Sequence, residues 1–162
     1  MVLILMGVAG CGKTTVGTRL AERLRVPFFD ADDFHSKENR ARMAQGTPLT
    51  DADRAEWLQR LVQSIRVWNQ EQPLTLLACS ALKHSYREVL AQAGGVEWIY
   101  LAGNRDLIAQ RLADRQGHFF NPTLLESQFQ DLEAPTDIWT IDVTPPVEIL
   151  VERIRQHLRE LK

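Results

Sequence analysis

The residues with the clearest chemical role stand in one glycine-rich segment near the start of the chain. They are Gly7, Val8, Ala9, Gly10, Cys11, Gly12, Lys13, Thr14 and Thr15. The pattern G-x-x-x-x-G-K-T is typical of a P-loop, in which glycines let backbone N–H groups converge on phosphate oxygens. The lysine ammonium binds the β- and γ-phosphates, and the threonine hydroxyl binds Mg²⁺. The segment therefore predicts binding of a nucleotide phosphate.

The residues around this segment favour a P-loop over a chance glycine-rich turn. An apolar run of strand length, Val2 to Met6, precedes it, and apolar residues follow it at helical spacing at Val16, Leu20 and Leu24. A P-loop needs this order, with a strand before the loop and a helix after it. The positive N-terminal end of that helix would face the same phosphate.

A second group of reactive side chains follows the next apolar run, at Asp30, Asp32 and Asp33. Three carboxylates within four residues repel one another unless something positive or a hydrogen-bond donor compensates them. Mg²⁺-ATP and a substrate hydroxyl would do so, with one acid as general base and another binding the water shell of Mg²⁺. The alternative is a turn in which aspartates cap the following helix. Because a P-loop is present, we favour the catalytic role.

Two arginines, Arg111 and Arg115, stand one helical turn apart in the second half of the chain. At this spacing their side chains share one face of a helix. They precede Gly117 and His118, so the segment resembles a mobile lid that closes over a transferred phosphoryl group. The two guanidinium groups would then stabilise the developing charge, and the lid would exclude water.

Further polar residues are candidates for binding a substrate in the same cleft. Ser80 and Lys83 follow the third apolar run, and His35 lies beside the aspartates. Arg54, in the segment between the second and third runs, is the best candidate for an anionic substrate. Arginine suits that role because its planar fork binds a carboxylate through two parallel hydrogen bonds.

These residues are distant in the sequence, so they need a fold that brings them to one edge of a sheet. The pattern of apolar residues predicts such a fold. Strand-like runs occur at residues 2–6, 26–30, 73–79, 96–101 and 137–143. Helical spacing and capping residues predict helices at about 14–25, 36–47, 51–70, 82–92, 104–115, 122–132 and 145–161. Strands that alternate with helices predict an α/β fold, a parallel five-stranded sheet flanked by helices. The site should lie at the carboxyl ends of the strands.

Length and composition fit a single domain over residues 1–162, because 44% apolar residues can supply one core. Within it we expect a helical substrate insertion at about 34–70 and a lid at about 111–131. The net charge of −2, without runs of like charge, gives no reason to expect a nucleic-acid partner. Apolar stretches are too short for a membrane span, so we expect no membrane partner and a cytoplasmic location.

A GTPase is one alternative that the sequence argues against. Asp114-Arg115-Gln116-Gly117 fits the pattern D-x-x-G, which in GTPases follows a strand. Here the pattern ends a helix that carries arginines. The guanine-binding pattern N-K-x-D occurs nowhere in the chain. We therefore reject a GTPase.

Taken in order, several blocks of the chain resemble the gluconokinase family. They are Gly7 to Thr14, Asp30 to His35, Pro48 to Arg54, Cys79 to Lys83 with Tyr86 and Arg87, and Arg115 to Phe119 with Leu125 to Phe129. A single P-loop is generic, but this ordered series spans nearly the whole chain. The resemblance implies a P-loop NTPase fold like that of nucleoside monophosphate kinases and ATP-dependent phosphorylation of D-gluconate at its 6-hydroxyl. It also implies a homodimer in the cytoplasm.

The resemblance and the chemistry together suggest a role for each candidate residue. Residues 7–15 would bind ATP, with Thr14 and Asp30 holding Mg²⁺ directly or through water. Asp32 or Asp33 would deprotonate the 6-hydroxyl, and this choice stays open. The charge on the transferring phosphoryl group would be stabilised by Lys13, Arg111 and Arg115. The gluconate contacts would be Asp32, His35, Arg54, Ser80, Lys83 and His118.

Two other interpretations remain at this point. The first is another small P-loop kinase, acting on shikimate, a nucleotide or a related sugar acid, because a basic insertion binds phosphate as readily as carboxylate. The second is a regulator that binds ATP without catalysis and uses it only to change conformation. A panel of acceptor substrates separates these interpretations.

Overall fold

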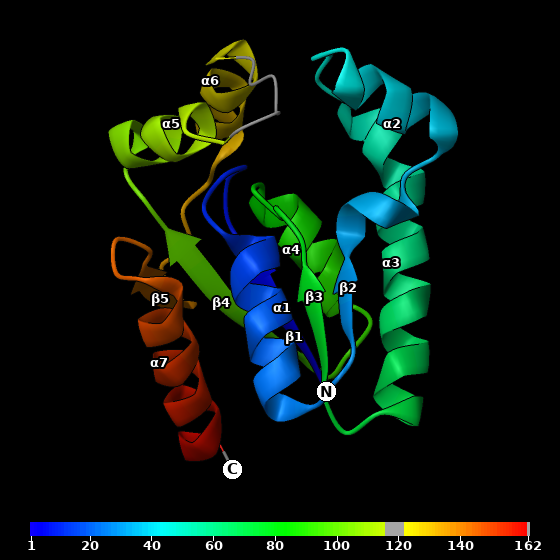
Figure 1. Ribbon diagram of the computed structural model, residues 1–162. Helices are drawn as coiled ribbons and strands as arrows, with labels where there is room; N and C mark the ends of the chain where they lie inside the picture. Colours follow the sequence, from blue (N-terminus) through cyan, green and yellow to red (C-terminus); the bar gives the residue numbers. More distant parts are fainter. Residues whose placement is uncertain (116–121, 162) are drawn as a thin grey trace.

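The computed structural model describes residues 1–115 and 122–161, and its centre is a parallel sheet. The strands are β1 (Val2–Met6), β2 (Phe28–Asp30), β3 (Thr75–Ala78), β4 (Val96–Ala102) and β5 (Trp139–Asp142). Their order across the sheet is β2-β3-β1-β4-β5, and every neighbouring pair is parallel (Figure 1). The predicted α/β fold with five parallel strands is therefore confirmed.

Helices cover both faces of the sheet. One face packs against α1 (Lys13–Leu24) and α7 (Val147–Glu160), and the other against α3 (Asp51–Glu71) and α4 (His84–Ala91). The central strand β1 shows why both layers form, because its side chains alternate between the faces. Leu3 and Leu5 belong to the first core, whereas Val2, Ile4 and Met6 belong to the second. All five are buried, as expected for a central parallel strand.

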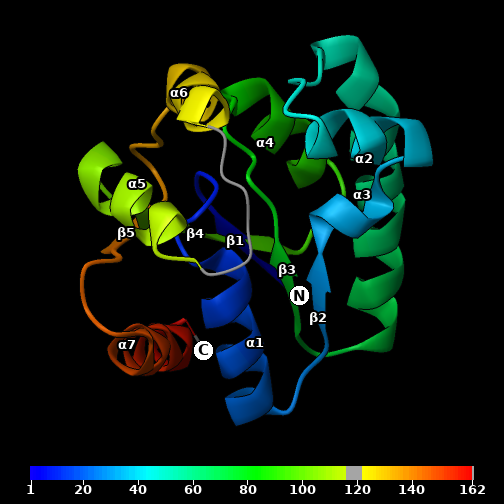
Figure 2. The same ribbon diagram turned by 45° about the horizontal axis from the view of Figure 1, so that its top comes forward.

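The remaining elements gather above the carboxyl ends of the strands. They are the 3₁₀ helix η1 (Ala31–Phe34), α2 (Lys37–Ala44), α5 (Arg105–Ala113) and α6 (Pro122–Asp131). In Figures 1 and 2, α2 lies on one side of the loop between β1 and α1, and α5 and α6 lie on the other. None of the helices in the described ranges is long and apolar enough to cross a membrane.

The start of α3 is fixed by a reciprocal cap. The Thr50 hydroxyl accepts a hydrogen bond from Asp53 N–H at 3.2 Å, and the Asp53 carboxylate accepts one from Thr50 N–H at 2.9 Å. This capping box satisfies two backbone donors at the helix start. It places Arg54 in the first turn of α3, at the edge where the strands end.

The structure corrects the prediction at the end of α5. This helix ends at Ala113, with Asp114 as its C-cap, so Arg115 lies beyond it. The expectation that Arg111 and Arg115 share one helical face is therefore wrong. Aspartate is a weak helix former, and its charge is unfavourable at the negative C-terminal end of a helix. The helix α2 is likewise shorter than predicted and is followed by Gly46 at a positive φ of 77°.

Candidate active site

The loop between β1 and α1 has the backbone geometry of an anion site. Gly10 and Gly12 take positive φ angles of 80° and 100°, which other residues rarely adopt. A Cβ at Gly10 would also lie only 2.6 Å from the Leu112 side chain. Gly12 is the N-cap of α1, and no side chain caps this helix. The first N–H groups of α1 are therefore available to an anion.

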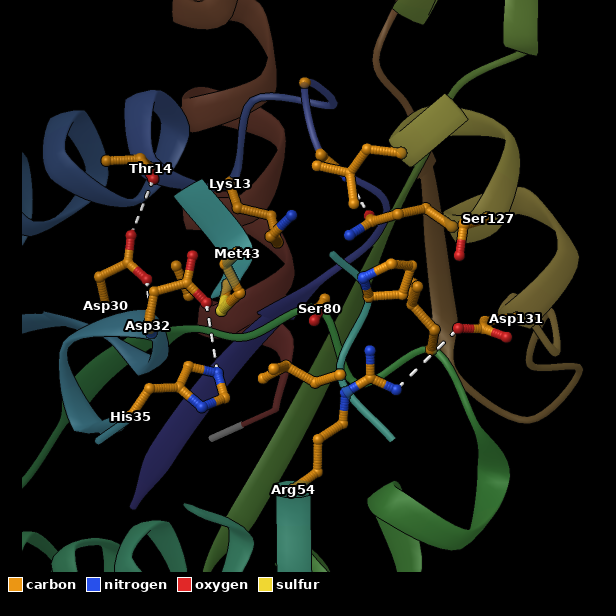
Figure 3. A pocket seen from close by; sticks show the side chains of 18 of the residues that line it. Lys13, Thr14, Asp30, Asp32, His35, Met43, Arg54, Ser80, Ser127 and Asp131 are labelled. Carbon is orange, nitrogen blue, oxygen red and sulfur yellow. Dashed lines mark hydrogen bonds and ion pairs between the residues drawn. The ribbon is translucent and has the colours of Figure 1, made fainter. Parts of the chain in front are cut away.

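The ammonium of Lys13 lies against the same loop. Its Nζ donates hydrogen bonds to the carbonyl oxygens of Gly7 at 2.8 Å and Val8 at 3.0 Å. Figure 3 shows Lys13 reaching into the cleft beside Thr14. The cation thus lies on the side of the loop that faces the cleft, where a nucleotide phosphate would need it.

A cleft of about 260 Å³ opens next to this loop and collects most of the predicted site residues. Its walls come from the loop, the ends of β2 and β3, the start of α3, and α6 (Figure 3). The predicted residues that line it are Ala9, Gly10, Gly12, Lys13, Thr14, Asp30, Asp32, His35, Arg54, Ser80 and Arg115. Segments distant in sequence therefore converge as expected at the carboxyl edge of the sheet.

Thr14 and Asp30 form a pair of oxygen donors at one end of the cleft. The Thr14 hydroxyl donates a hydrogen bond to Asp30 Oδ2 at 3.2 Å. Asp30 Oδ1 accepts one from Asp32 N–H at 3.0 Å, which fixes the carboxylate as the N-cap of η1. Within residues 1–115 and 122–161, no cluster of three acidic, histidine or cysteine ligands occurs. A hydroxyl and one carboxylate fit Mg²⁺, which takes its remaining oxygens from water and substrate phosphates.

Asp32 and Asp33, which the sequence left equivalent, have different surroundings. Asp32 lines the cleft, whereas Asp33 lies outside it and has Oδ1 4.0 Å from the Arg40 guanidinium. Desolvation in the cleft, followed by the Asp30 carboxylate, raises the pKa of Asp32 above its usual value. The Asp32 side chain is still 66% exposed, which limits this effect. A raised pKa suits a general base.

His35 forms part of the cleft wall as a buried ring. It stacks on Trp57 with ring centroids 4.3 Å apart, and its side chain is only 4% exposed. Its Nε2 lies 4.0 Å from Asp32 Oδ1. Burial, together with the charges of Arg54 and Arg40, lowers the pKa of His35 to about 4. The imidazole is therefore neutral at neutral pH.

This buried histidine predicts a loss of stability in acid. Between pH 6.5 and 4 the unfolded chain binds a proton at His35 that the folded chain does not, despite the nearby Asp32 carboxylate. The shift from 6.5 to about 4 corresponds to about 3 kcal/mol, present above pH 6.5 and lost progressively toward pH 4. His35→Phe keeps a ring against Trp57 and should remove this dependence. Urea denaturation at pH 7, 5.5 and 4 measures it, and equal acid slopes in both proteins would contradict it.

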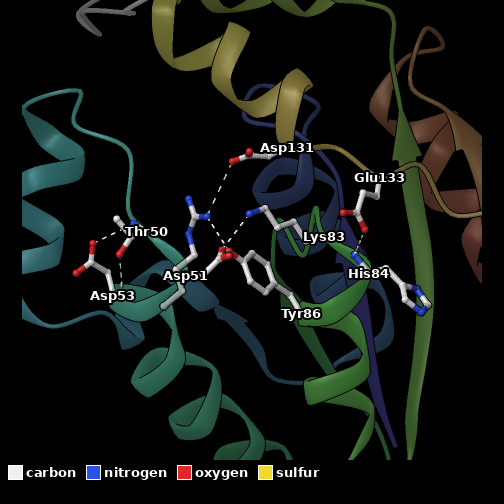
Figure 4. Close-up of polar contacts among 9 residues, drawn as sticks. Thr50, Asp51, Asp53, Lys83, His84, Tyr86, Asp131 and Glu133 are labelled. Atoms are coloured by element: carbon white, nitrogen blue, oxygen red, sulfur yellow. Dashed lines mark hydrogen bonds and ion pairs between the residues drawn. The ribbon is translucent and has the colours of Figure 1, made fainter.

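Arg54 is held by a polar network that joins α3, α4 and α6. Figure 4 shows Asp51, Lys83, Tyr86 and Asp131, which belong to this network. Arg54 Nη1 donates to the Tyr86 hydroxyl at 3.0 Å and lies 4.0 Å from Asp131 Oδ2. The Tyr86 hydroxyl in turn donates to Asp51, which also accepts a 3.0 Å hydrogen bond from Lys83 Nζ. The Arg54 side chain is 20% exposed and lines the cleft. It therefore presents an oriented guanidinium to any anion that enters.

The structure does not bring Lys83 into the cleft with Ser80. Ser80 lines the cleft, but Lys83 lies outside its lining and bonds to Asp51, which raises the pKa of the lysine. The turn between them is held by buried Arg87, which donates to the carbonyl oxygens of Ala81, Leu82 and Glu133 at 2.9 to 3.0 Å. Lys83 therefore belongs to the hydrogen-bond network that reaches Arg54 through Asp51 and Tyr86.

The predicted lid residues also separate. Arg111 does not line the main cleft, and its Nη2 donates to Val143 O at 2.6 Å. It borders a second cleft of about 280 Å³ with Pro145 and Pro146, on the other side of the glycine-rich loop. Arg115 borders both clefts. His118 lies outside the described residues.

Residues of α6 line the cleft although the sequence analysis assigned them no individual role within the expected lid. They are Leu124, Ser127, Gln128 and Asp131. Their spacing of i, i+3, i+4 and i+7 places them on one helical face, a signal that was present in the sequence. The block Leu125 to Phe129 entered the family resemblance, but the role of its side chains requires contacts with distant parts of the chain.

Comparison with known proteins agrees with this geometry. A family model for shikimate kinase matches residues 9–135. The chain is 39% identical to the thermoresistant gluconokinase of Escherichia coli (strain K12), over 93% of this chain and 89% of that protein. The family-model match runs from Ala9 in the glycine-rich loop to beyond the end of α6, so it includes most of the residues that line the cleft.

Solved structures give the same result. A sugar kinase from Janibacter sp. HTCC2649 superposes with a TM-score of 0.89 at 40% identity, covering 98% of this chain and 94% of that one. A gluconokinase from Sinorhizobium meliloti 1021 gives a TM-score of 0.84 at 31% identity, covering 99% and 96%. The chain therefore belongs to the gluconokinase family and has the fold of P-loop kinases.

Proposed function

We propose that this protein transfers the γ-phosphoryl group of ATP to the 6-hydroxyl of D-gluconate. The observation that carries the proposal is the convergence of Lys13, Asp32 and Arg54 on one cleft. The cleft thus offers a phosphate-binding cation, a base and an anion-binding guanidinium. D-Gluconate needs the last two, because it has hydroxyl groups and one carboxylate. The gluconokinase relatives support the same substrate.

The nucleotide half of the cleft would bind the phosphates of ATP. The amides of the glycine-rich loop and the start of α1 surround the phosphates, and Lys13 exchanges its carbonyl partners for phosphate oxygens. Thr14 and Asp30 would hold Mg²⁺, which when bound neutralises charge on the β- and γ-phosphates. Arg115 borders this region and would stabilise the transferring group.

The acceptor half would orient the sugar acid and remove one proton. Arg54 binds the carboxylate, while Ser80 and the neutral His35 contact hydroxyl groups. Asp32 accepts the proton of the 6-hydroxyl. The hydroxyl oxygen bonds to the γ-phosphorus as the bond between the γ-phosphorus and the β,γ-bridging oxygen breaks. The products are ADP and 6-phospho-D-gluconate.

We assign Arg111 to the nucleoside instead of the transferred group. The second cleft shares Gly10 and Gly12 with the phosphate loop, and its outer wall contains Pro145 and Pro146. Apolar rings and a flat guanidinium suit an aromatic base. The adenine of ATP would therefore lie between Arg111 and this proline pair.

The test is ADP release from Mg-ATP with and without D-gluconate, beside shikimate, other aldonates and nucleoside monophosphates. We expect strong stimulation by D-gluconate, because Arg54 and Asp32 match its two ends. Turnover with shikimate instead would support kinase activity but reject D-gluconate as the substrate. Shikimate is included because the family model for shikimate kinase matches the chain. ATP binding without turnover on any acceptor would favour a regulator.

The organisation around this site is also a proposal. We infer one kinase domain in which residues 34–70 form the substrate insertion and residues 111–131 the lid. We also infer a cytoplasmic homodimer. The family resemblance supports these inferences. Sedimentation analysis and cell fractionation test the dimer and the location.

A further inference from the structure

The helix α6 contacts the phosphate loop directly. Gln128 Oε1 accepts a hydrogen bond from Ala9 N–H at 2.6 Å, across 119 positions of sequence. The contact is partly buried, and both residues line the main cleft. A carboxamide oxygen that caps a loop amide fixes the distance between helix and loop. Gln128 therefore joins α6 to the nucleotide half of the site.

The same helix contacts the acceptor half. Asp131 lies one turn after Gln128, and its Oδ2 is 4.0 Å from the Arg54 guanidinium. Ser127 also lines the cleft. Because residues at i and i+3 share one face of a helix, a displacement of α6 would move Gln128 and Asp131 together. One short helix thus touches both half-sites through neighbouring side chains.

We propose that Gln128 is a positioning residue that couples nucleotide binding at the phosphate loop to acceptor binding at Arg54. A phosphate on the loop restrains the backbone around Ala9, and the hydrogen bond extends this restraint to α6. The helix then holds Asp131 and Ser127 in place before the acceptor arrives. Binding of the acceptor then costs less conformational entropy, because its site is already ordered. By thermodynamic linkage, each ligand tightens the binding of the other.

This coupling is reciprocal and can be measured as a ratio of affinities. We use the dissociation constant of D-gluconate without nucleotide, and with saturating Mg²⁺ and a non-hydrolysable ATP analogue. In the unmodified protein we expect the nucleotide to tighten D-gluconate binding by about fivefold to 150-fold. Gln128→Met should bring this ratio close to one. Methionine keeps the length and helix propensity of glutamine but lacks the acceptor oxygen.

A matched control is available on the same helix. Gln130 is exposed and does not line the cleft, so Gln130→Met should leave the ratio unchanged. Gln128→Ala provides a second variant if methionine distorts the packing. A purely structural role for Gln128 would weaken both ligands separately and leave the ratio intact. That result, or a ratio near one in the unmodified protein, would overturn the proposal.

The inference rests on the proposed function for the identity of its acceptor, and the experiment separates the two. If D-gluconate is not the substrate, the acceptor panel shows this through ADP release. The same ratio is then measured with the acceptor that the panel identifies. Steady-state kinetics add a further readout, because Gln128→Met should raise the KM for the acceptor more at saturating ATP than at low ATP.

Discussion

Asp32→Asn is expected to lower kcat for gluconate phosphorylation about a thousandfold while changing ATP affinity less than about threefold. Asp32 lies in η1, directly after β2, and lines the cleft with Lys13, where the 6-hydroxyl must approach the γ-phosphate. Asparagine has nearly the same shape but cannot accept the proton. Stopped-flow or coupled assays give kcat, and fluorescence titration with a nucleotide analogue gives the affinity.

The neighbouring aspartate provides the control for this prediction. Asp33 lies outside the cleft, and its closest cation is Arg40 at 4.0 Å on the exposed surface. Asp33→Asn should therefore change kcat by no more than a few fold, as is usual for an exposed ion pair. If Asp33→Asn had the larger effect, the base would be Asp33 and the position of the acceptor would need revision.

Arg54→Met is expected to raise the KM for D-gluconate about a hundredfold, because it leaves a substrate carboxylate without its cation in a partly buried site. Methionine retains the apolar stem that packs beside Tyr86. The affinity for ATP should change little, since Arg54 lies on the acceptor side of the cleft. Initial rates at varied D-gluconate and saturating ATP measure the effect.

Arg60 is the matched control for Arg54 because it lies on the same helix. Its side chain is 47% exposed and pairs with Glu56 on the surface of α3. Arg60→Met should leave the KM for both substrates unchanged. An unchanged KM for D-gluconate in Arg54→Met would show that another group binds the carboxylate. The carboxylate-binding role would then have to be assigned to a different residue of the cleft.

The sequence predicted the fold well because the strands are buried on both faces. A continuous apolar run such as Val2 to Met6, followed by a P-loop and a helix, is typical of a buried parallel strand. Among the strands, β2, β3 and β5 begin two residues later than predicted, and prolines stand at the first two of these starts. Pro27 and Pro73 have no N–H for the sheet, so β2 and β3 begin at Phe28 and Thr75.

The site was predictable where its residues are contiguous in the sequence. It was uncertain where the direction of the backbone decides which side chains face the cleft. The glycine-rich loop carries its geometry in a fixed spacing. Asp32 and Asp33 could not be distinguished, because η1 turns successive residues about 120° apart and the sequence does not show which one faces the cleft. The early end of α5 separated Arg111 from Arg115 in the same way.

The contacts of α6 could not be predicted from local patterns at all. Gln128 meets Ala9 across 119 positions, and Asp131 meets Arg54 from the opposite half of the chain. Helical periodicity identifies the face on which Gln128 and Asp131 lie, but not the element that this face meets. Only the packing of α6 above the sheet brings these residues to the phosphate loop.

Trp57 gives the protein an optical reporter of its own active site. Its indole stacks on His35, donates to Ala31 O at 2.7 Å and lines the cleft, whereas Trp68, Trp98 and Trp139 do not line it. Indole emission responds to changes in the polarity and charge around the ring. Occupation of the acceptor half should therefore alter the intrinsic fluorescence of the protein, so binding can be followed without any attached dye.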